Sequence, residues 1–356
     1  MSNWQNPITT WGQAGKTVPG AGDFNRIEGN TQYLKDEIDS HGVTMGREND
    51  IYVVAKIGPL FRFTPLEVNY GGDIRAIAVD DSYVYVAGTT TRTVRKLRKS
   101  DLSQVAESAA YGGIIYAIAV DDNNVYVGGS TTQTVWRLNK SNLSLVATSA
   151  NYGGSIYAIA VDNNNVYVGG STTQTVWRLS KTSLSLLAES AGYGGNIWAI
   201  AVDDNSVYIG GRETLTVRKL RKSDLSQVAE SANYGGNIYA IATDNLYVYV
   251  GGSMTQTVWK LNKYNLSQVA ESADYGGIIY AMATDDEFVY VGGGTTRTVR
   301  KLRKSDLSQV AKSADYGGTI FAIATDDEFV YIGGETTRTV RVIENCDLIK
   351  IIRRYQ

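Results

Sequence analysis

Residues 111–151 read YGGIIYAIAVDDNNVYVGGSTTQTVWRLNKSNLSLVATSAN, and residues 152–192 repeat this stretch with about eight changes. Seven units of 41 residues run from residue 70 to the last residue, 356. A period near 40 residues is typical of a repeat architecture. Each unit starts with a Tyr-Gly-Gly triplet, at Tyr70, Tyr111, Tyr152, Tyr193, Tyr234, Tyr275 and Tyr316.

Each unit contains four short runs rich in Val, Ile, Tyr and Thr. In the unit quoted above they are residues 114–120, 125–127, 134–138 and 143–147, and Gly, Asn, Asp and Ser separate them. Such runs predict β-strands, and no segment after residue 69 has a helical period. Four strands repeated seven times predict an all-β protein, a seven-bladed β-propeller with four-stranded blades. Alanines in the first run suit the crowded axis, and a tyrosine in every second run suits the space between blades.

The composition excludes several classes of function. The 356 residues carry 34 basic and 36 acidic side chains, a net charge of −2 that is unsuited to holding a nucleic acid by bulk charge. No run of 18 apolar residues occurs, which argues against membrane insertion. Cys346 is the only cysteine and His41 the only histidine, so neither a disulfide framework nor a two-histidine metal site is expected. We expect no metal and no cofactor.

One aspartate ends the first strand of every unit. We interpret it as a turn former whose carboxylate accepts backbone N–H groups, with calcium binding as the alternative. The seven residues are Asp80, Asp121, Asp162, Asp203, Asp244, Asp285 and Asp326.

We find no catalytic constellation in this sequence. His41 lies outside the repeats, and Cys346 has acidic neighbours that disfavour a thiolate. The carboxylates recur around the ring, whereas a catalytic pair would break the symmetry of the repeat. We therefore predict that the chain is not an enzyme, and a glycan-degrading activity stays as an alternative.

Binding is favoured by positions that vary between units. Flat aromatic faces beside amide and guanidinium donors suit a sugar, whose C–H face stacks and whose hydroxyls accept hydrogen bonds. Packing between blades is the alternative interpretation of the same residues. The candidate ligand-binding residues are Trp136, Trp177, Trp259, Arg95, Arg218, Arg300 and Arg341 at one third-strand position, Gln133, Gln174 and Gln256 three residues earlier, and Trp198 at the aromatic position of the first strand.

A basic run, VRKLRKSDLSQ, occurs identically at residues 94–104, 217–227 and 299–309. Strand residues alternate faces, so the run does not form one dense patch. We interpret it as a solvated blade edge, with contact to an anionic wall polymer as the functional alternative.

The 69 residues before the repeats divide into two parts, so the predicted organisation is 1–42, 43–69 and 70–356. Residues 1–42 form an arm and a helix for attachment or oligomerisation, and the helix either packs on its own domain or self-associates, as a trimer. Residues 43–69 connect to the propeller, and the strands expected at 51–56 and 61–64 could close the ring. The last unit has its own expected fourth strand at 348–352, which leaves the mode of closure open. The attachment candidates are Trp4, Trp11, Phe24, Ile27, Leu34 and Ile38.

Two front segments carry a resemblance to known proteins. The sequence WQNPITTW (4–11), followed by DFNRIEGNTQYLK (23–35), resembles the N-terminal segment of tail-fibre and minor structural proteins of Gram-positive phages and prophages. That resemblance covers about 40 residues. The repeats resemble seven-bladed PQQ/YVTN-like propellers in their strand pattern, and the WD dipeptide of WD repeats is absent.

The resemblance implies a phage or prophage-derived receptor-binding protein of the tail. Its partners would be a host cell-wall or surface polysaccharide and phage tail or baseplate proteins. The N-terminus lacks a signal-peptide pattern, so we expect a virion protein made in the host cytoplasm. A purely structural or protein-binding propeller of a virion is the alternative.

Overall fold

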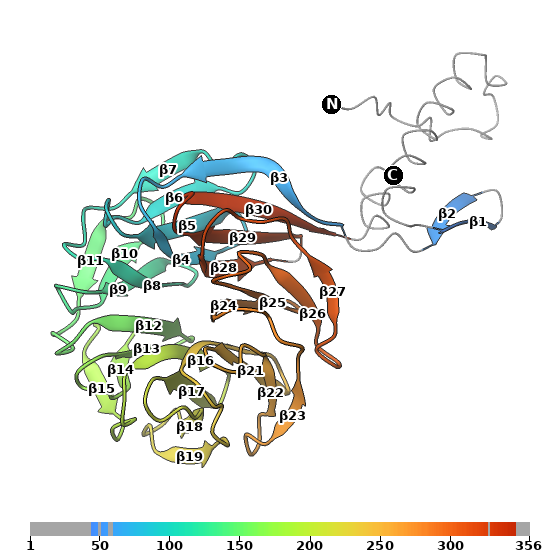
Figure 1. Ribbon diagram of the computed structural model, residues 1–356. Coiled ribbons are helices and arrows are strands. Elements are labelled where there is room, and N and C mark those ends of the chain that lie inside the picture. The colour runs from blue at the N-terminus through green and yellow to red at the C-terminus, as the bar shows by residue number, and fades with distance from the viewer. Residues whose placement is uncertain (1–43, 49–50, 56–59, 327, 347–356) are drawn as a thin grey trace, which may run out of the picture. The chain divides into compact units, whose positions relative to one another are not determined.

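A computed structural model describes residues 44–48, 51–55, 60–326 and 328–346. Its strands from residue 60 onward form seven four-stranded sheets arranged as a ring (Figure 1). The prediction of an all-β, seven-bladed propeller is confirmed. Strands β1 (Thr44–Glu48) and β2 (Ile51–Ala55) form a separate antiparallel pair. No helix capable of crossing a membrane is found in the described part of the chain.

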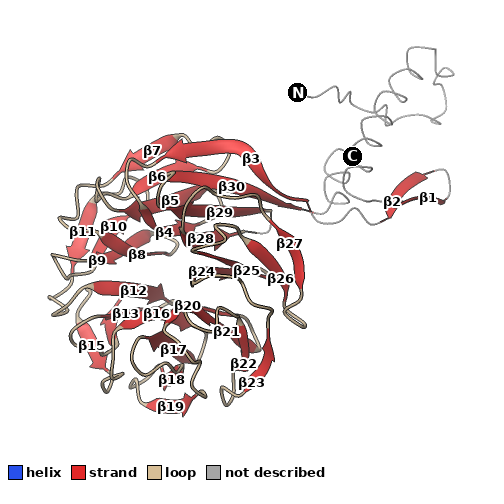
Figure 2. Ribbon diagram, viewed as in Figure 1, coloured by secondary structure: helices blue, strands red, loops and turns tan. Residues whose placement is uncertain are grey.

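The first two strands of each blade form its inner half (Figure 2). The innermost strands are β4 (Ile74–Val79), β8 (Ile115–Val120), β12 (Ile156–Val161), β16 (Ile197–Val202), β20 (Ile238–Thr243), β24 (Ile279–Thr284) and β28 (Ile320–Thr325). The second strands are β5 (Tyr83–Gly88), β9 (Asn124–Gly129), β13 (Asn165–Gly170), β17 (Ser206–Gly211), β21 (Tyr247–Gly252), β25 (Phe288–Gly293) and β29 (Phe329–Gly334).

The third and fourth strands form the outer half of each blade. The third strands are β6 (Arg95–Arg98), β10 (Trp136–Asn139), β14 (Trp177–Ser180), β18 (Arg218–Arg221), β22 (Trp259–Asn262), β26 (Arg300–Arg303) and β30 (Thr339–Cys346). The fourth strands are β7 (Gln104–Glu107), β11 (Leu145–Thr148), β15 (Leu186–Glu189), β19 (Gln227–Glu230), β23 (Gln268–Glu271), β27 (Gln309–Lys312) and, in the last blade, β3 (Leu60–Asn69).

The ring is closed by β3, which precedes all seven repeats in the chain. The last sheet has the order β28-β29-β30-β3, so its outer strand comes from the segment that the sequence assigned to a connector with possible closing strands. The Arg341 guanidinium of β30 pairs with Glu67 of β3 at 3.0 Å, and the Tyr70 N–H donates to the Arg338 carbonyl at 2.8 Å. The alternative fourth strand at 348–352 lies outside the described residues, as do His41 and the predicted helix.

The tyrosine of the Tyr-Gly-Gly triplet joins neighbouring blades. The Tyr193 N–H donates to the Gln174 carbonyl of the preceding unit at 2.7 Å, and its hydroxyl donates to the Thr216 carbonyl of its own unit at 2.6 Å. All seven of these tyrosines are at most 2% exposed. The glycines let the chain approach this closely, since Gly153 has a φ of +91° and a Cβ on Gly154 would lie 2.2 Å from the Ser171 carbonyl oxygen.

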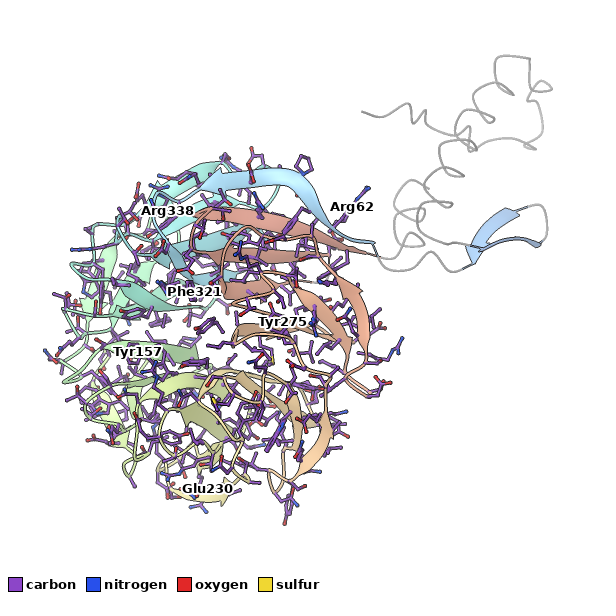
Figure 3. The ribbon with its side chains drawn as sticks, viewed as in Figure 1. Arg62, Tyr157, Glu230, Tyr275, Phe321 and Arg338 are labelled. Carbon is purple, nitrogen blue, oxygen red and sulfur yellow. The ribbon has the colours of Figure 1, made fainter. Side chains whose placement is uncertain are left out.

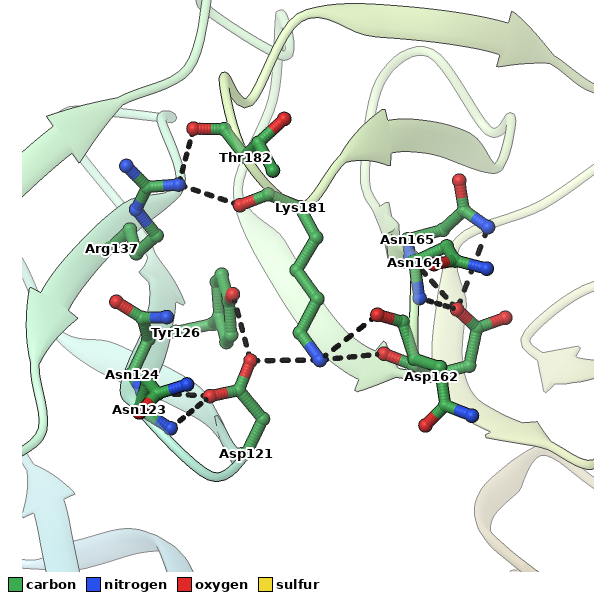
Figure 4. Close-up of polar contacts among 11 residues, drawn as sticks. Asp121, Asn123, Asn124, Tyr126, Arg137, Asp162, Asn164, Asn165, Lys181 and Thr182 are labelled. Carbon is green, nitrogen blue, oxygen red and sulfur yellow. Dashed lines mark hydrogen bonds and ion pairs between the residues drawn. The ribbon is translucent and has the colours of Figure 1, made fainter.

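The aspartate that ends the first strand acts as the predicted turn former and also links blades (Figure 4). Asp121 Oδ1 accepts the N–H groups of Asn123 and Asn124 at 2.8 and 2.7 Å. Asp121 Oδ2 accepts the Tyr126 hydroxyl at 3.0 Å and pairs with Lys181 of the next blade at 2.9 Å. Further pairs in the described part of the chain are Lys140–Asp80, Lys222–Asp162, Lys263–Asp203, Lys304–Asp244 and Lys99–Asp326.

The apolar core also lies between blades. Ala117 and Tyr126 of one blade cluster with Tyr152, Ile156 and Val166 of the next, and all five are buried. A single sheet of this size has no sufficient core of its own, so each blade gains most of its apolar burial from its neighbours.

The interpretation of the basic run as a solvated blade edge is wrong for both lysines of its first copy, Lys96 and Lys99. Lys96 is 5% exposed, lies 3.9 Å over the Tyr83 ring and donates to the Lys140 carbonyl of the next blade at 2.9 Å. Lys99 pairs with Asp326 across the closing junction. Arg98 is exposed. The lysines are therefore used within the molecule, because the long side chains of Lys96 on β6 and of Lys99 in the following turn reach the neighbouring blades.

Closure by β3 predicts different stabilities for two fragments. A chain of residues 70–356 lacks β3 and leaves the edge of β30 unpaired, so we expect its thermal midpoint to fall by roughly 5–10 °C relative to a chain of residues 43–356. Circular dichroism measures both midpoints. Equal midpoints would show that β3 is not needed to close the ring.

The Asp–Lys junction predicts a loss of stability in acid. Burial by itself would raise the pKa of Asp162, but the Lys222 ammonium, the N–H groups of Asn164 and Asn165 and the Tyr167 hydroxyl outweigh it and lower that pKa from 3.8 to about 2. A lowered carboxyl pKa contributes stability that is present above the unfolded value, 3.8, and disappears as the pH falls toward 2.

We expect Asp162→Asn to lower the free energy of unfolding by about 2 kcal/mol at neutral pH, because Lys222 loses its charged partner. The variant should also depend less on pH between 3.8 and about 2 in urea titrations. Asp122→Asn is the control, because Asp122 is an exposed carboxylate in the equivalent turn of the second unit. The third unit already has an asparagine, Asn163, at this position. Equal losses in the two variants would contradict a specific role for the junction.

Candidate functional site

The Tyr-Gly-Gly segments and the loops after the second strands lie together on one face, which we call the loop face. Its members in the second unit are residues 111–114 and 130–134, and the Ser130 N–H donates to the Ile114 carbonyl at 2.9 Å. All three variable positions that the sequence singled out lie on or next to these loops.

The third-strand Trp/Arg position packs on the tyrosine of the triplet in every blade. Trp136 meets Tyr111 edge to face with ring centroids 5.1 Å apart, while the Arg218 guanidinium lies 5.0 Å from the Tyr193 centroid. Both groups are flat and fit the same place, which explains their exchange between units. The same contact joins Trp177 to Tyr152, Trp259 to Tyr234, Arg95 to Tyr70, Arg300 to Tyr275 and Arg341 to Tyr316.

The arginines at this position also hold the loop backbone. Arg218 pairs with Glu230 of the outer strand at 3.4 Å and donates to the Gly192 carbonyl at 3.0 Å. Arg300 donates to the carbonyls of Asp274 and Tyr275, both at 2.6 Å. These arginines therefore stabilise the backbone of the loop face. That they contact a ligand stays a prediction.

The position three residues before the Trp/Arg position has a left-handed backbone conformation. Gln133, Gln174 and Gln256 are half-buried and have φ values of 56°, 55° and 54°. A left-handed backbone costs a non-glycine residue roughly 1–2 kcal/mol, and here the Gln174 carbonyl accepts the inter-blade bond from Tyr193. Whether the amide side chains contact a ligand stays a prediction as well.

The first-strand aromatic position forms a continuous ring around the central channel, which we call the axial ring. Tyr157 and Trp198 stack with centroids 4.0 Å apart and an angle of 5° between their planes, and the remaining neighbours meet tilted or edge to face. Figure 3 labels two of these residues, Tyr157 on β12 and Phe321 on β28, on the innermost strands of their blades. The axial ring consists of Arg75, Tyr116, Tyr157, Trp198, Tyr239, Tyr280 and Phe321.

The axial ring lines a cavity of about 190 Å³ together with the alanine and the next apolar residue of each inner strand. All seven of its side chains are half-buried, and some of their faces are covered within the ring, as where Tyr157 stacks on Trp198. Burial raises the pKa of Tyr116 and Tyr280 above the ordinary value of 10.0, so these hydroxyls are protonated hydrogen-bond donors at neutral pH, as an unshifted tyrosine would be. The channel is thus walled by large aromatic groups and not only by the small residues expected near the axis.

Sequence reasoning selected only Trp198 from this ring as a candidate, and it did not select Arg75 of the ring or Arg212, which lies beside it. The Arg75 guanidinium lies 3.9 Å over Phe321, and the Arg212 guanidinium lies 4.9 Å over Trp198. The available signal was the break in the repeat at these two positions, since the other units have an aromatic residue at the first and no arginine at the second.

The opposite ends of the blades hold two wider cavities, of about 740 and 660 Å³. Asp244, Lys304 and Asp326 line them, and these residues belong to the inter-blade ion pairs. No group of three His, Cys, Asp or Glu residues that could hold a metal occurs among the described residues.

Trp4, Trp11 and the candidate helix residues Phe24, Ile27, Leu34 and Ile38 lie outside the described residues. Their assignment to attachment stays a prediction.

Comparison with known proteins supports the fold alone. No protein family model matches the chain, and no curated protein matches it. The WD40 β-propeller domain of Doa1 is similar, with a TM-score of 0.69 and 14% identity over 81% of this chain and 98% of that domain. A computationally designed protein, Ika8, is similar with a TM-score of 0.64 and 15% identity over 81% of this chain and 99% of that one. The chain therefore has the architecture of a β-propeller.

The exchange of Trp and Arg predicts an asymmetric effect of substitution. Trp177 lies opposite Glu189, as Arg218 lies opposite Glu230, whereas Trp136 lies opposite Thr148. We expect Trp177→Arg to cost less than about 1 kcal/mol of unfolding free energy, because the new guanidinium gains both the tyrosine face and the carboxylate.

Trp136→Arg lacks the carboxylate and should cost more than Trp177→Arg. Trp177→Ala removes the whole contact and should cost about 3 kcal/mol. Denaturant titration of the three variants tests the account, and equal losses for the two arginine variants would contradict it.

Proposed function

We propose that this chain is a phage or prophage-derived tail-fibre protein whose propeller binds a host cell-surface glycan. The observation that carries the proposal is the half-buried axial ring, whose aromatic side chains line the central cavity. Sugar rings present apolar C–H faces that stack on aromatic groups, and their hydroxyls pair with the phenol groups beside them.

The loop face offers further contacts around that cavity. Trp136, Trp177 and Trp259 are half-buried, and each has one edge against a tyrosine. Individual sugar contacts are weak, so repeated contacts on seven blades would raise the affinity for a polymer through effective concentration. Self-association through residues 1–42 would multiply this effect.

The front of the chain supports the tail-fibre part of the proposal. Residues 4–11 and 23–35 resemble the start of Gram-positive phage tail proteins, which implies attachment to tail or baseplate proteins and a place in the virion. In this arrangement the propeller is the part that meets the host.

A structural or protein-binding propeller is the second candidate. The tyrosines of the triplet and of the second strand are all at most 2% exposed, which favours packing as the role of those fourteen residues. This role does not extend to the axial ring, whose members are half-buried.

Binding of the full chain to purified cell walls of Gram-positive hosts tests the proposal. We expect Tyr157→Ala combined with Trp198→Ala to weaken sedimentation with the walls by about tenfold or more, since two aromatic groups that line the cavity are lost. Trp136→Ala combined with Trp177→Ala should weaken it to a smaller extent. Tyr264→Ala is the control, because Tyr264 is 87% exposed in the turn between β22 and β23, away from the loop face.

Three outcomes separate the candidates. A larger loss of binding in the axial-ring variant than in the Trp136 and Trp177 variant, with the Tyr264 control unchanged, supports glycan recognition at the channel. Absence of binding to every wall preparation favours the structural role. Release of soluble sugars from the walls would indicate a glycan-degrading enzyme instead.

A further inference from the structure

Two arginines break the sevenfold pattern where the axial ring meets the loop face. Arg75 stands where six units have an aromatic side chain, and Arg212 follows directly after β17. The residues equivalent to Arg212 are Thr89, Ser130, Ser171, Ser253, Gly294 and Glu335. These two arginines make the surface asymmetric, whereas the rest of the ring is nearly symmetric, so a ligand that binds here would be held in one orientation.

Both guanidinium groups lie against aromatic faces of the axial ring. The Arg75 Cζ is 3.9 Å from the Phe321 centroid, and the Arg212 Cζ is 4.9 Å from Trp198 and 5.9 Å from Tyr239. Stacking fixes the plane of each guanidinium and leaves its N–H edge free to meet a flat acceptor.

Most of their N–H donors have no partner within the described residues. Arg75 has one contact, to Asp73 at 3.4 Å, and Arg212 has one, to the Tyr239 hydroxyl at 3.5 Å. The Nε atoms of both arginines are buried without a hydrogen bond. Buried donors without acceptors are costly, so an acceptor from outside the chain would be bound favourably.

Nearby carboxylates do not fill this need. Asp73 is shared between Arg75 and Arg338, which lies 3.7 Å from its other oxygen. Glu213 is exposed and accepts the Asn196 N–H at 3.0 Å. Arg212 forms no ion pair among the described residues, so its charge is open to an anion.

We propose that the channel mouth binds the terminal residue of an acidic glycan, with the sugar ring on the axial ring and its anionic group on one of the two arginines, Arg75 or Arg212. The cavity of about 190 Å³ is smaller than the roughly 300–1,000 Å³ typical of drug-sized ligands, which suits one sugar residue. A carboxylate and a phosphate both match the guanidinium fork. This inference rests on the proposed glycan binding and specifies the ligand class.

Matched sugars test the inference on the full chain. Glucose, glucuronic acid and glucose 6-phosphate share one ring and differ at C6, and the galactose series gives a second stereochemistry. Ligand-observed NMR measures the six affinities for the native protein and for Arg75→Tyr and Arg212→Ser. These variants restore residues that other units already have, Tyr116 and Ser130 among them, so we expect them to fold.

We expect at least one acidic sugar to bind about tenfold or more tightly than its neutral counterpart, and one of the two variants, Arg75→Tyr or Arg212→Ser, to remove that preference. Comparison of the carboxylate sugars with the phosphate sugars identifies which anionic group the protein prefers. Arg98→Ser is the control, because Arg98 is exposed on β6 and its loss changes the net charge equally.

The possible failures are distinguishable. Equal affinity for acidic and neutral sugars, or a preference that survives both variants, overturns the inference while leaving glycan binding intact. No binding of any of the six sugars also overturns it, and the wall-binding experiment then decides separately whether the proposed function stands.

Discussion

The structure depends on the need of each blade to pack against the next. A four-stranded sheet of these short strands has too little core of its own, so the triplet tyrosine, the second-strand tyrosine and the apolar side chains between blades supply most of the burial. Hydrogen bonds from Tyr193 to both blades fix the spacing, and Lys–Asp pairs repeat at most of the junctions. Because most junctions use the same residue types, the repeat can be copied with little change.

A ring of repeated blades needs one junction of a different kind, where the two ends of the propeller segment come together. Here β3 supplies the outer strand of the last blade, so that blade combines both ends of the repeat region. The Arg341–Glu67 pair provides at this junction what Arg218–Glu230 provides within a single unit. At the same junction Lys99 reaches Asp326, so the ion-pair pattern continues from the last unit to the first.

Residues that are the same in all units hold the blades together, whereas residues that differ between units are candidates for ligand binding. The Trp/Arg position varies because two flat groups fit one tyrosine face. Arg75 and Arg212 occur at positions where the other units have no arginine, and most of their donors are unpaired within the described residues. They are the natural place for a directional ligand contact on an otherwise repetitive surface.

The sequence by itself determined the number of blades, the four strands of each, and the turn role of Asp121 and its equivalents, because these follow from local spacing and strand propensity. Only the tertiary structure decided that β3 closes the ring, that Lys96 and Lys181 reach neighbouring blades, and that the first-strand aromatics converge on one channel. Those features depend on how separate blades are placed in space. A periodic sequence specifies each unit, while the contacts between residues tens to hundreds of positions apart exist only once the ring has closed.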